Sequence, residues 1–177
     1  MRIAVSGAHR TGKTTLIEEL SRALPAYAVV EEPYYLLEEE GHAFAEMPSV
    51  DDFELQLERS LQCVDDSGKD QLFDRCPADL LAYLMTHRDS DGFDAGIWLP
   101  RLENAMRRLD LIVFVPIESP DRVIVPDPED RELRRCVDEE LRDIVVEDRW
   151  SFGLETIEVT GTLRERARQV LAHVKGR

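Results

Sequence analysis

The chain is poor in basic residues, and this shortage limits what it can bind. Its 177 residues include 22 Lys and Arg against 37 Asp and Glu, which gives a formal net charge of −15 at pH 7. Nucleic-acid binding draws most of its affinity from Lys and Arg that neutralise phosphates, so we expect no nucleic-acid partner. Any positively charged site in this chain must therefore be local.

Cysteine and long apolar segments are also scarce. The three cysteines are odd in number and widely spaced, so we expect Cys63, Cys76 and Cys136 to be reduced structural thiols rather than a disulfide framework or a metal site. The longest apolar run, 109–117, contains Asp110 and Pro116 and is far shorter than the roughly 20 residues of a membrane span. The first residues lack the basic and apolar regions of a signal peptide. We therefore expect a cytoplasmic protein with no membrane partner.

Repeats and Gly/Ser linkers are absent, which favours a single domain over residues 1–177. Strand-like apolar runs alternate with helical patterns, and this alternation predicts an α/β fold, in which a parallel sheet carries helices on both faces. The predicted strands are 2–6, 27–30, 71–74, 111–115 and 156–159. Three predicted helices have both ends defined: 51–66, 93–108 with an interruption or restart at Pro100, and 129–147 after a proline-rich loop. Three more are predicted to end before Pro25, to follow residue 76 and to follow Gly161.

The strongest chemical signal is the loop between the first predicted strand and helix. Residues 7–14 read Gly-Ala-His-Arg-Thr-Gly-Lys-Thr and match GxxxxGK[ST] at every fixed position. Gly7 and Gly12 let the backbone wrap a polyphosphate so that amide N–H groups face its charge. Lys13 should reach the β- and γ-phosphates, Thr14 should ligate Mg²⁺, and Thr15 should add a phosphate hydrogen bond. The remaining nucleotide contacts are expected from His9, as a wall residue rather than a base, and from Arg10 and Thr11.

Such a loop occurs in GTPases, in ATP-driven motors and in small-molecule kinases, and absences again help to choose. Guanine recognition by an Asn-Lys-x-Asp element is excluded because the single asparagine, Asn104, lies in Glu-Asn-Ala. Motor ATPases carry an apolar strand that ends in paired acids, whereas the best apolar strand here ends Val115-Pro116. What remains resembles the small-molecule kinases.

Glu31-Glu32-Pro33 at the end of the second predicted strand resembles the Glu-Pro element of deoxynucleoside kinases. There, the glutamate before the proline acts as base toward the acceptor hydroxyl, a role that the resemblance gives to Glu32. A carboxylate at the carboxyl end of a parallel strand faces the crevice where such sheets bind ligands. With two adjacent glutamates the register stays open, so Glu31 is also a candidate for acceptor binding, and a solvated acidic turn is the alternative.

Two further elements resemble parts of nucleoside and nucleotide kinases. Asp74-Arg75 follows the third predicted strand, where the resemblance gives the acid to the metal, beside Thr14, and the arginine to substrate or phosphates. A structural salt bridge is the alternative.

Asp130-Arg131-Glu132-Leu133-Arg134-Arg135 has the place and arginine content of a kinase lid, which we expect at about 118–136, although alternating charges also suit a solvated helix face. The catalytic candidates here are Arg131, which should also contact the donor nucleotide, and Arg135.

Most of the chain resembles the AAA-type P-loop kinase domain that is fused to bacterial regulators of NAD synthesis and is similar to ribosylnicotinamide kinase. The likeness rests on the phosphate loop, the Glu-Glu-Pro turn, Phe-Asp-Arg, the Asp-Arg lid and Val159-Thr160-Gly161. It implies five strands in the order 2-3-1-4-5, Mg²⁺ and ATP as cofactors, and Gly161 beside the donor adenine. It also leaves a homodimer open. The lid approach, 125–129, lacks the Asp-Gly-x-Arg expected of that family, so the acceptor is not transferred.

The sequence thus predicts an ATP-dependent kinase that phosphorylates a hydroxyl of a small metabolite, first of all a nucleoside or a nicotinamide riboside-like acceptor. Gln56 and Arg59 resemble the residues with which deoxynucleoside kinases read a base, and Tyr34 or Tyr35 could stack on it. A surface role for Gln56 and a core or rim role for the tyrosines are the alternatives. A regulatory ATPase, and a kinase of a nucleotide or an antibiotic, are the rival functions.

Overall fold

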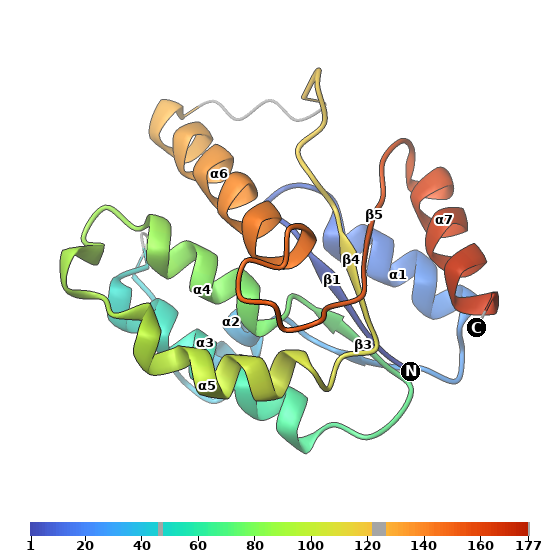
Figure 1. Cartoon of the computed structure of the whole chain (residues 1–177), viewed down its shortest axis with the longest axis horizontal. Helices are drawn as coiled ribbons and strands as arrows, with labels where there is room; N and C mark the ends of the chain where they lie inside the picture. Colours follow the sequence, from blue (N-terminus) through green and yellow to red (C-terminus); the bar gives the residue numbers. More distant parts are fainter. Residues whose placement is uncertain (46–47, 122–126, 177) are drawn as a thin grey trace.

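The computed structural model describes residues 1–45, 48–121 and 127–176. Its centre is a five-stranded sheet in the order β2-β3-β1-β4-β5, and every neighbouring pair is parallel (Figure 1). The predicted fold class and strand order are therefore confirmed. The strands are β1 (Arg2–Ser6), β2 (Ala28–Val30), β3 (Gln71–Asp74), β4 (Leu111–Phe114) and β5 (Thr156–Glu158).

Helices cover both faces of the sheet because each central strand is apolar on both sides. Ile3 and Val5 of β1 join a core cluster with the helices on one face, while Ala4 between them joins the cluster on the other. The first face carries α1 (Lys13–Ala23) and α7 (Leu163–Lys175). The second carries α3 (Val50–Asp66), α4 (Pro77–Thr86), α5 (Ala95–Met106) and α6 (Pro128–Leu141), with a π-helical turn at Arg142–Val146. A short 3₁₀ helix, η1 (Ser90–Gly92), precedes α5.

Prolines account for the differences from the predicted elements. We predicted no helix directly after Pro33, but Pro33 occupies the first turn of α2 (Pro33–Glu39), where its missing N–H has no partner to lose. Pro100 neither interrupts nor restarts α5, because it lies on an exposed side of the helix where water can reach the freed carbonyl. Residues 122–126 of the predicted proline-rich loop lie outside the described residues.

Several residues that we expected to be structural have that role. Trp98 and Trp150 are partly buried against the larger core cluster. Cys63, Cys76 and Cys136 are all free thiols, and Cys76 is fully enclosed at the start of α4. Within the described part of the chain, no helix is both long and apolar enough to cross a membrane.

Candidate active site

The phosphate loop joins the end of β1 to the start of α1, at the carboxyl edge of the sheet. Gly7 has φ +150°, and a Cβ there would lie 2.4 Å from the Val115 carbonyl oxygen, so no other residue fits without a shift. Gly12 has φ +89° and caps α1, with only an arginine side chain near the place of its missing Cβ. The two glycines therefore set the turn that brings the N-terminus of α1 to the loop.

Lys13 is held inside this loop. Its ammonium group donates to the Ala8 carbonyl oxygen at 2.8 Å, and the residue is only 5% exposed. Burial, together with the charge of Arg75, lowers the pKa of Lys13 to about 8. Lys13 thus carries a positive charge that is poorly compensated by water, which favours an incoming anion.

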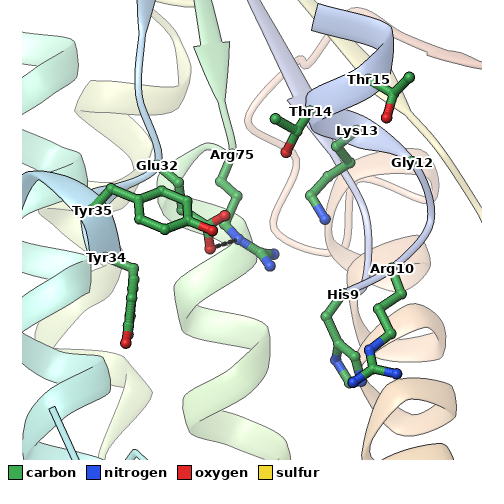
Figure 2. Close-up of a pocket in the computed structure, with 10 residues that line it drawn as sticks. All are labelled: His9, Arg10, Gly12, Lys13, Thr14, Thr15, Glu32, Tyr34, Tyr35 and Arg75. Carbon is green, nitrogen blue, oxygen red and sulfur yellow. Dashed lines mark hydrogen bonds and ion pairs between the residues drawn. The ribbon is translucent and has the colours of Figure 1, made fainter. Parts of the chain in front are cut away.

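A cavity of about 410 Å³ opens in front of the loop (Figure 2). In Figure 2, Lys13 reaches toward it from one side, and Glu32 and Arg75 stand across from it. The cavity thus brings together eight of the predicted site residues, with Tyr34 and Tyr35 at its wall. The eight are His9, Arg10, Gly12, Lys13, Thr14, Thr15, Glu32 and Arg75.

Glu32 and Arg75 form an ion pair in this cavity. Glu32 immediately precedes α2, and Arg75 has φ +76°, a strained conformation that turns its side chain back toward the loop. Burial opposes ionisation of Glu32, but the charges of Arg75 and Lys13 outweigh it and hold the pKa of Glu32 below its usual value. Glu32 is therefore a carboxylate at neutral pH.

Thr14 and Asp74, the two residues predicted to hold a metal, are in contact. The Thr14 hydroxyl donates to Asp74 Oδ2 at 2.8 Å, whereas buried Asp74 Oδ1 has no hydrogen-bond partner among the described residues. Burial raises the pKa of Asp74, so a cation would favour its charged form. A hydroxyl beside a carboxylate oxygen with free lone pairs suits Mg²⁺, which takes its other ligands from phosphates and water. No cluster of three or more His, Cys, Asp or Glu suited to a metal occurs in the described ranges.

The two glutamates differ in the cavities that they line, because a second cavity of about 440 Å³ lies beside the first. Glu32 borders both cavities, whereas exposed Glu31 borders only the second, together with Glu39 and Asp74. Glu32 is thus the glutamate that faces Lys13 across the first cavity.

The arginines of the predicted lid are arranged differently from our prediction. Arg135 does not face the loop, because its guanidinium binds Glu132 at 2.6 Å and Glu139 at 2.5 Å on the exposed side of α6. Arg134, one residue earlier, is 3% exposed and donates through Nε to the His9 carbonyl oxygen at 2.9 Å. Arg131 is exposed near the start of α6. The arginine that the fold brings to the phosphate loop is therefore Arg134, in place of Arg135.

The predicted base-reading residues do not line either cavity. Gln56 is buried and donates to the Asp52 carbonyl oxygen within α3 at 3.3 Å, so the alternative of a surface role is wrong. Arg59 pairs with Glu40 at 2.7 Å. Gly161 has φ +98° and donates its N–H to Glu118 Oε1 at 2.6 Å. The ligand contacts predicted for these three residues therefore stay predictions, because none of the three lines either cavity.

Sequence reasoning missed two buried groups that support the loop. Asp79 is fully buried and accepts hydrogen bonds from the Gly7 and Cys76 amides, each at 3.0 Å. The Tyr83 hydroxyl accepts from the His9 amide at 2.9 Å and lies 3.0 Å from His9 Nδ1. Burial lowers the pKa of His9 to about 4, so it is neutral at physiological pH and serves as loop wall. The sequence did hold one signal for these supports: Asp79 is a charged residue on an otherwise apolar face of α4.

Comparison with known proteins places the chain in a family. Residues 2–166 match the family described as an AAA domain. The chain belongs to this AAA domain family. A search of curated proteins gave no match.

The AAA domain shares its fold with several solved kinases at identities too low to say more than that. Deoxyadenosine kinase from M. mycoides, with dCMP and dCDP bound, has a TM-score of 0.69 at 12% identity and covers 100% of both chains. Thymidylate kinase from Candida albicans has a TM-score of 0.65 at 15% identity and covers 98% of this chain and 90% of its own. NadR in complex with NR has a TM-score of 0.68 at 19% identity and covers 99% of this chain but 49% of its own. The resemblance found in the sequence is thereby confirmed.

Proposed function

We propose that this AAA domain is an ATP-dependent phosphotransferase that moves the γ-phosphoryl group of Mg-ATP to a hydroxyl of a small metabolite. The observation that carries the proposal is the single cavity in which Lys13 of the phosphate loop faces the ionised carboxylate of Glu32. One side of the cavity suits a polyphosphate, and the other suits a group that must lose a proton. Phosphoryl transfer needs both at once.

In this mechanism the loop amides and Lys13 bind the donor phosphates, and Arg75, which lines the same cavity, stabilises the charge that develops on the transferred group. Glu32 accepts a hydrogen bond from the acceptor hydroxyl and so orients the hydroxyl oxygen toward the γ-phosphorus. As the bond between that oxygen and the phosphorus forms, Glu32 takes the hydroxyl proton and the phosphorus separates from ADP. The Arg75 ion pair fixes the direction of the Glu32 carboxylate before the acceptor arrives. Thr14 and Asp74 would hold Mg²⁺, which neutralises phosphate charge when bound.

A nucleoside or nicotinamide riboside-like acceptor is our first choice. Tyr34 and Tyr35 stand at the cavity wall, and Tyr34 stacks on Phe44 with ring centroids 4.4 Å apart. A planar ring next to the reactive hydroxyl would extend this aromatic stack. The deoxyadenosine kinase and NadR neighbours were solved with nucleotide-type and NR ligands respectively, which supports this class.

Two substitutions test the proposal. Lys13→Ala should abolish measurable Mg-ATP binding and turnover, because it removes the buried cation of the loop. Glu32→Gln should keep ATP binding but lower acceptor phosphorylation by about 10²- to 10⁴-fold, the usual contribution of a positioned base. ADP release with mass detection of product, over a panel of nucleosides and other small alcohols, supplies the measurement. Glu31→Gln is the matched control and should keep most activity.

The outcomes separate the rivals. Full transfer by Glu32→Gln would remove the base assignment, and a large loss in Glu31→Gln would move it by one residue. Phosphorylation of a nucleotide or an aminoglycoside but of no nucleoside would retain the kinase and change its acceptor. ATP binding without acceptor-dependent ADP release across the panel would favour a regulatory ATPase.

A further inference from the structure

Three carbonyl oxygens of the phosphate loop, at alternate positions, each accept a hydrogen bond from an arginine. The carbonyls belong to Gly7, His9 and Thr11. The donors are Arg75 after β3, Arg134 on α6 and Arg166 on α7. Three segments that are distant in sequence thus hold one short loop, and two of the three arginines, Arg134 and Arg166, have no role in the mechanism above.

Arg166 is held on both sides. Its Nη1 donates to the Thr11 carbonyl oxygen at 2.7 Å, and its Nη2 lies 2.9 Å from Glu118 Oε1. The Arg166 and Glu118 side chains are only 12% and 13% exposed. The same Glu118 oxygen accepts from the Gly161 amide, so the carboxylate also ties down the turn that begins α7.

Arg134 repeats this arrangement from the opposite side of the loop. Its Nε donates to the His9 carbonyl oxygen at 2.9 Å, and its terminal nitrogens pair with Asp121. Asp121, like Glu118, comes from the segment after β4. Each arginine therefore bridges a loop carbonyl and a carboxylate that follows the same strand, which fixes both ends of the guanidinium fork.

These bonds determine where the amides point, because a trans peptide directs its C=O and N–H to opposite sides. When the Thr11 carbonyl faces Arg166, the Gly12 amide faces away from α7. In the same way, the His9 carbonyl on Arg134 turns the Arg10 amide away from α6. Arg10 and Gly12 both line the 410 Å³ cavity. By contrast, the amides of Gly7 and His9 are already bonded to Asp79 and Tyr83.

We propose that Arg134 and Arg166 are positioning residues that preset the phosphate loop for the donor polyphosphate. The inference rests on the proposed function insofar as the donor is a nucleoside triphosphate. It gives Arg134 a role different from that of a lid arginine that contacts the transferred group. If the peptide groups of the loop are already oriented, nucleotide binding does not lose the conformational entropy of ordering them. The two arginines therefore increase the affinity for the donor rather than the rate of the chemical step.

The test measures Mg-ATP and Mg-ADP affinity by calorimetry, steady-state constants with varied ATP, and thermal unfolding without nucleotide. Arg166→Met and Arg134→Met should each raise the dissociation constants of both nucleotides and the KM for ATP by about ten- to a hundredfold. The kcat at saturating ATP should change far less. Arg166→Lys should recover only part of the affinity, because one ammonium cannot bridge Thr11 and Glu118 as the fork does.

Matched controls are two other arginines on the same helical segments. Arg168 is exposed on α7, whereas Arg142, just beyond α6, is half-buried, pairs with Glu158 of β5 and lies over the Phe114 ring. Neither arginine contacts the phosphate loop in the described hydrogen bonds, so Arg168→Met and Arg142→Met should leave nucleotide affinity unchanged. If Arg166→Met does not fold, Arg166→Lys carries the test, since it keeps a charge beside Glu118.

Two results would overturn the inference. One is a folded Arg166→Met or Arg134→Met variant with wild-type affinity for both nucleotides. The other is a large fall in kcat at unchanged affinity, which would place the arginine on the transferred group. Failure of the wild-type chain to bind Mg-ATP would instead refute the proposed function. Binding without transfer to any acceptor would refute only the transferase activity and leave the affinity arm intact.

Discussion

At the scale of single residues, the unusual feature is a lysine whose charge is expensive to keep. Lys13 has its pKa lowered from 10.5 to about 8, first by burial and then by Arg75. The protonated form binds phosphate, and a bound polyphosphate stabilises that form in return. Nucleotide binding and protonation of Lys13 are therefore linked above pH 8.

The linkage gives a prediction whose sign is fixed. Between pH 7 and pH 9 the free protein loses the Lys13 proton, so Mg-ATP affinity should fall as pH rises, approaching tenfold per unit above the pKa. Binding at pH 9 should take up close to one proton, seen as a difference in calorimetric heat between two buffers of unlike ionisation enthalpy. Lys13→Arg, which stays charged, should bind with little pH dependence. Constant wild-type affinity from pH 7 to pH 9 would refute a lowered Lys13 pKa.

A second residue-scale prediction concerns the first glycine of the loop. Gly7→Ala puts a Cβ 2.4 Å from the Val115 carbonyl oxygen at a φ of +150°. We expect a loss of about 1–3 kcal/mol in unfolding free energy, the usual cost of such strain, together with weakened ATP binding. Chemical denaturation and calorimetry would measure both. Gly68→Ala is the control, because nothing lies within 4 Å of its missing Cβ. Equal stability of the two variants would contradict the argument.

At the scale of elements, α7 links its own stability to the loop. Its first turn is closed by a capping box, in which Thr162 accepts from the Glu165 amide and the Glu165 carboxylate accepts from the Thr162 amide. Arg166 follows in the next turn. Loosening the start of α7 should therefore reach the Thr11 carbonyl, even though Thr162 itself lines neither described cavity.

The prediction compares two capping boxes. Thr162→Ala and Ser49→Ala, the equivalent change on α3, should each cost about 1 kcal/mol in unfolding free energy. Only Thr162→Ala should also weaken Mg-ATP binding, and Thr162→Ser should restore it. Denaturant titration and calorimetry on the three variants decide the matter. Equal ATP affinity in Thr162→Ala and Ser49→Ala would mean that α7 does not act on the loop.

The lid helix shows how two adjacent arginines come to lie in different surroundings. Successive helix residues point about 100° apart, so Arg134 and Arg135 cannot share a role. Arg134 lies on the stripe of Val137, Leu141 and Ile144, all of which are buried. That spacing was present in the sequence and favoured Arg134 as the inward arginine.

At the scale of the whole molecule, the features that could be predicted from the sequence are those that local residue patterns determine. Strand order, helices on both faces and the Gly7–Lys13 loop follow from apolar periodicity, a fixed motif and the family resemblance. The supports of the loop do not, because Asp79, Tyr83 and Arg166 meet it only after the chain has crossed the sheet several times. Their bonds to the loop include backbone atoms of Gly7, His9 and Thr11, whose positions depend on the folded chain rather than on a residue pattern.

The net charge of −15 takes on a spatial meaning in the folded molecule. Basic side chains converge on one loop, where Lys13, Arg75 and Arg134 are nearly fully buried, while most carboxylates lie elsewhere. Low-dielectric surroundings strengthen the field of these cations inside the cavity. An acidic chain can in this way offer a local site to a polyanion.

The contact between Thr11 and Arg166 joins residues 155 positions apart. During synthesis, the complete phosphate-loop sequence leaves the ribosome long before α7 exists. A nascent chain that ends before residue 166 therefore carries the nucleotide-binding motif without the bond that sets its shape. The phosphate loop should therefore reach its full affinity for nucleotide only when α7 docks against it.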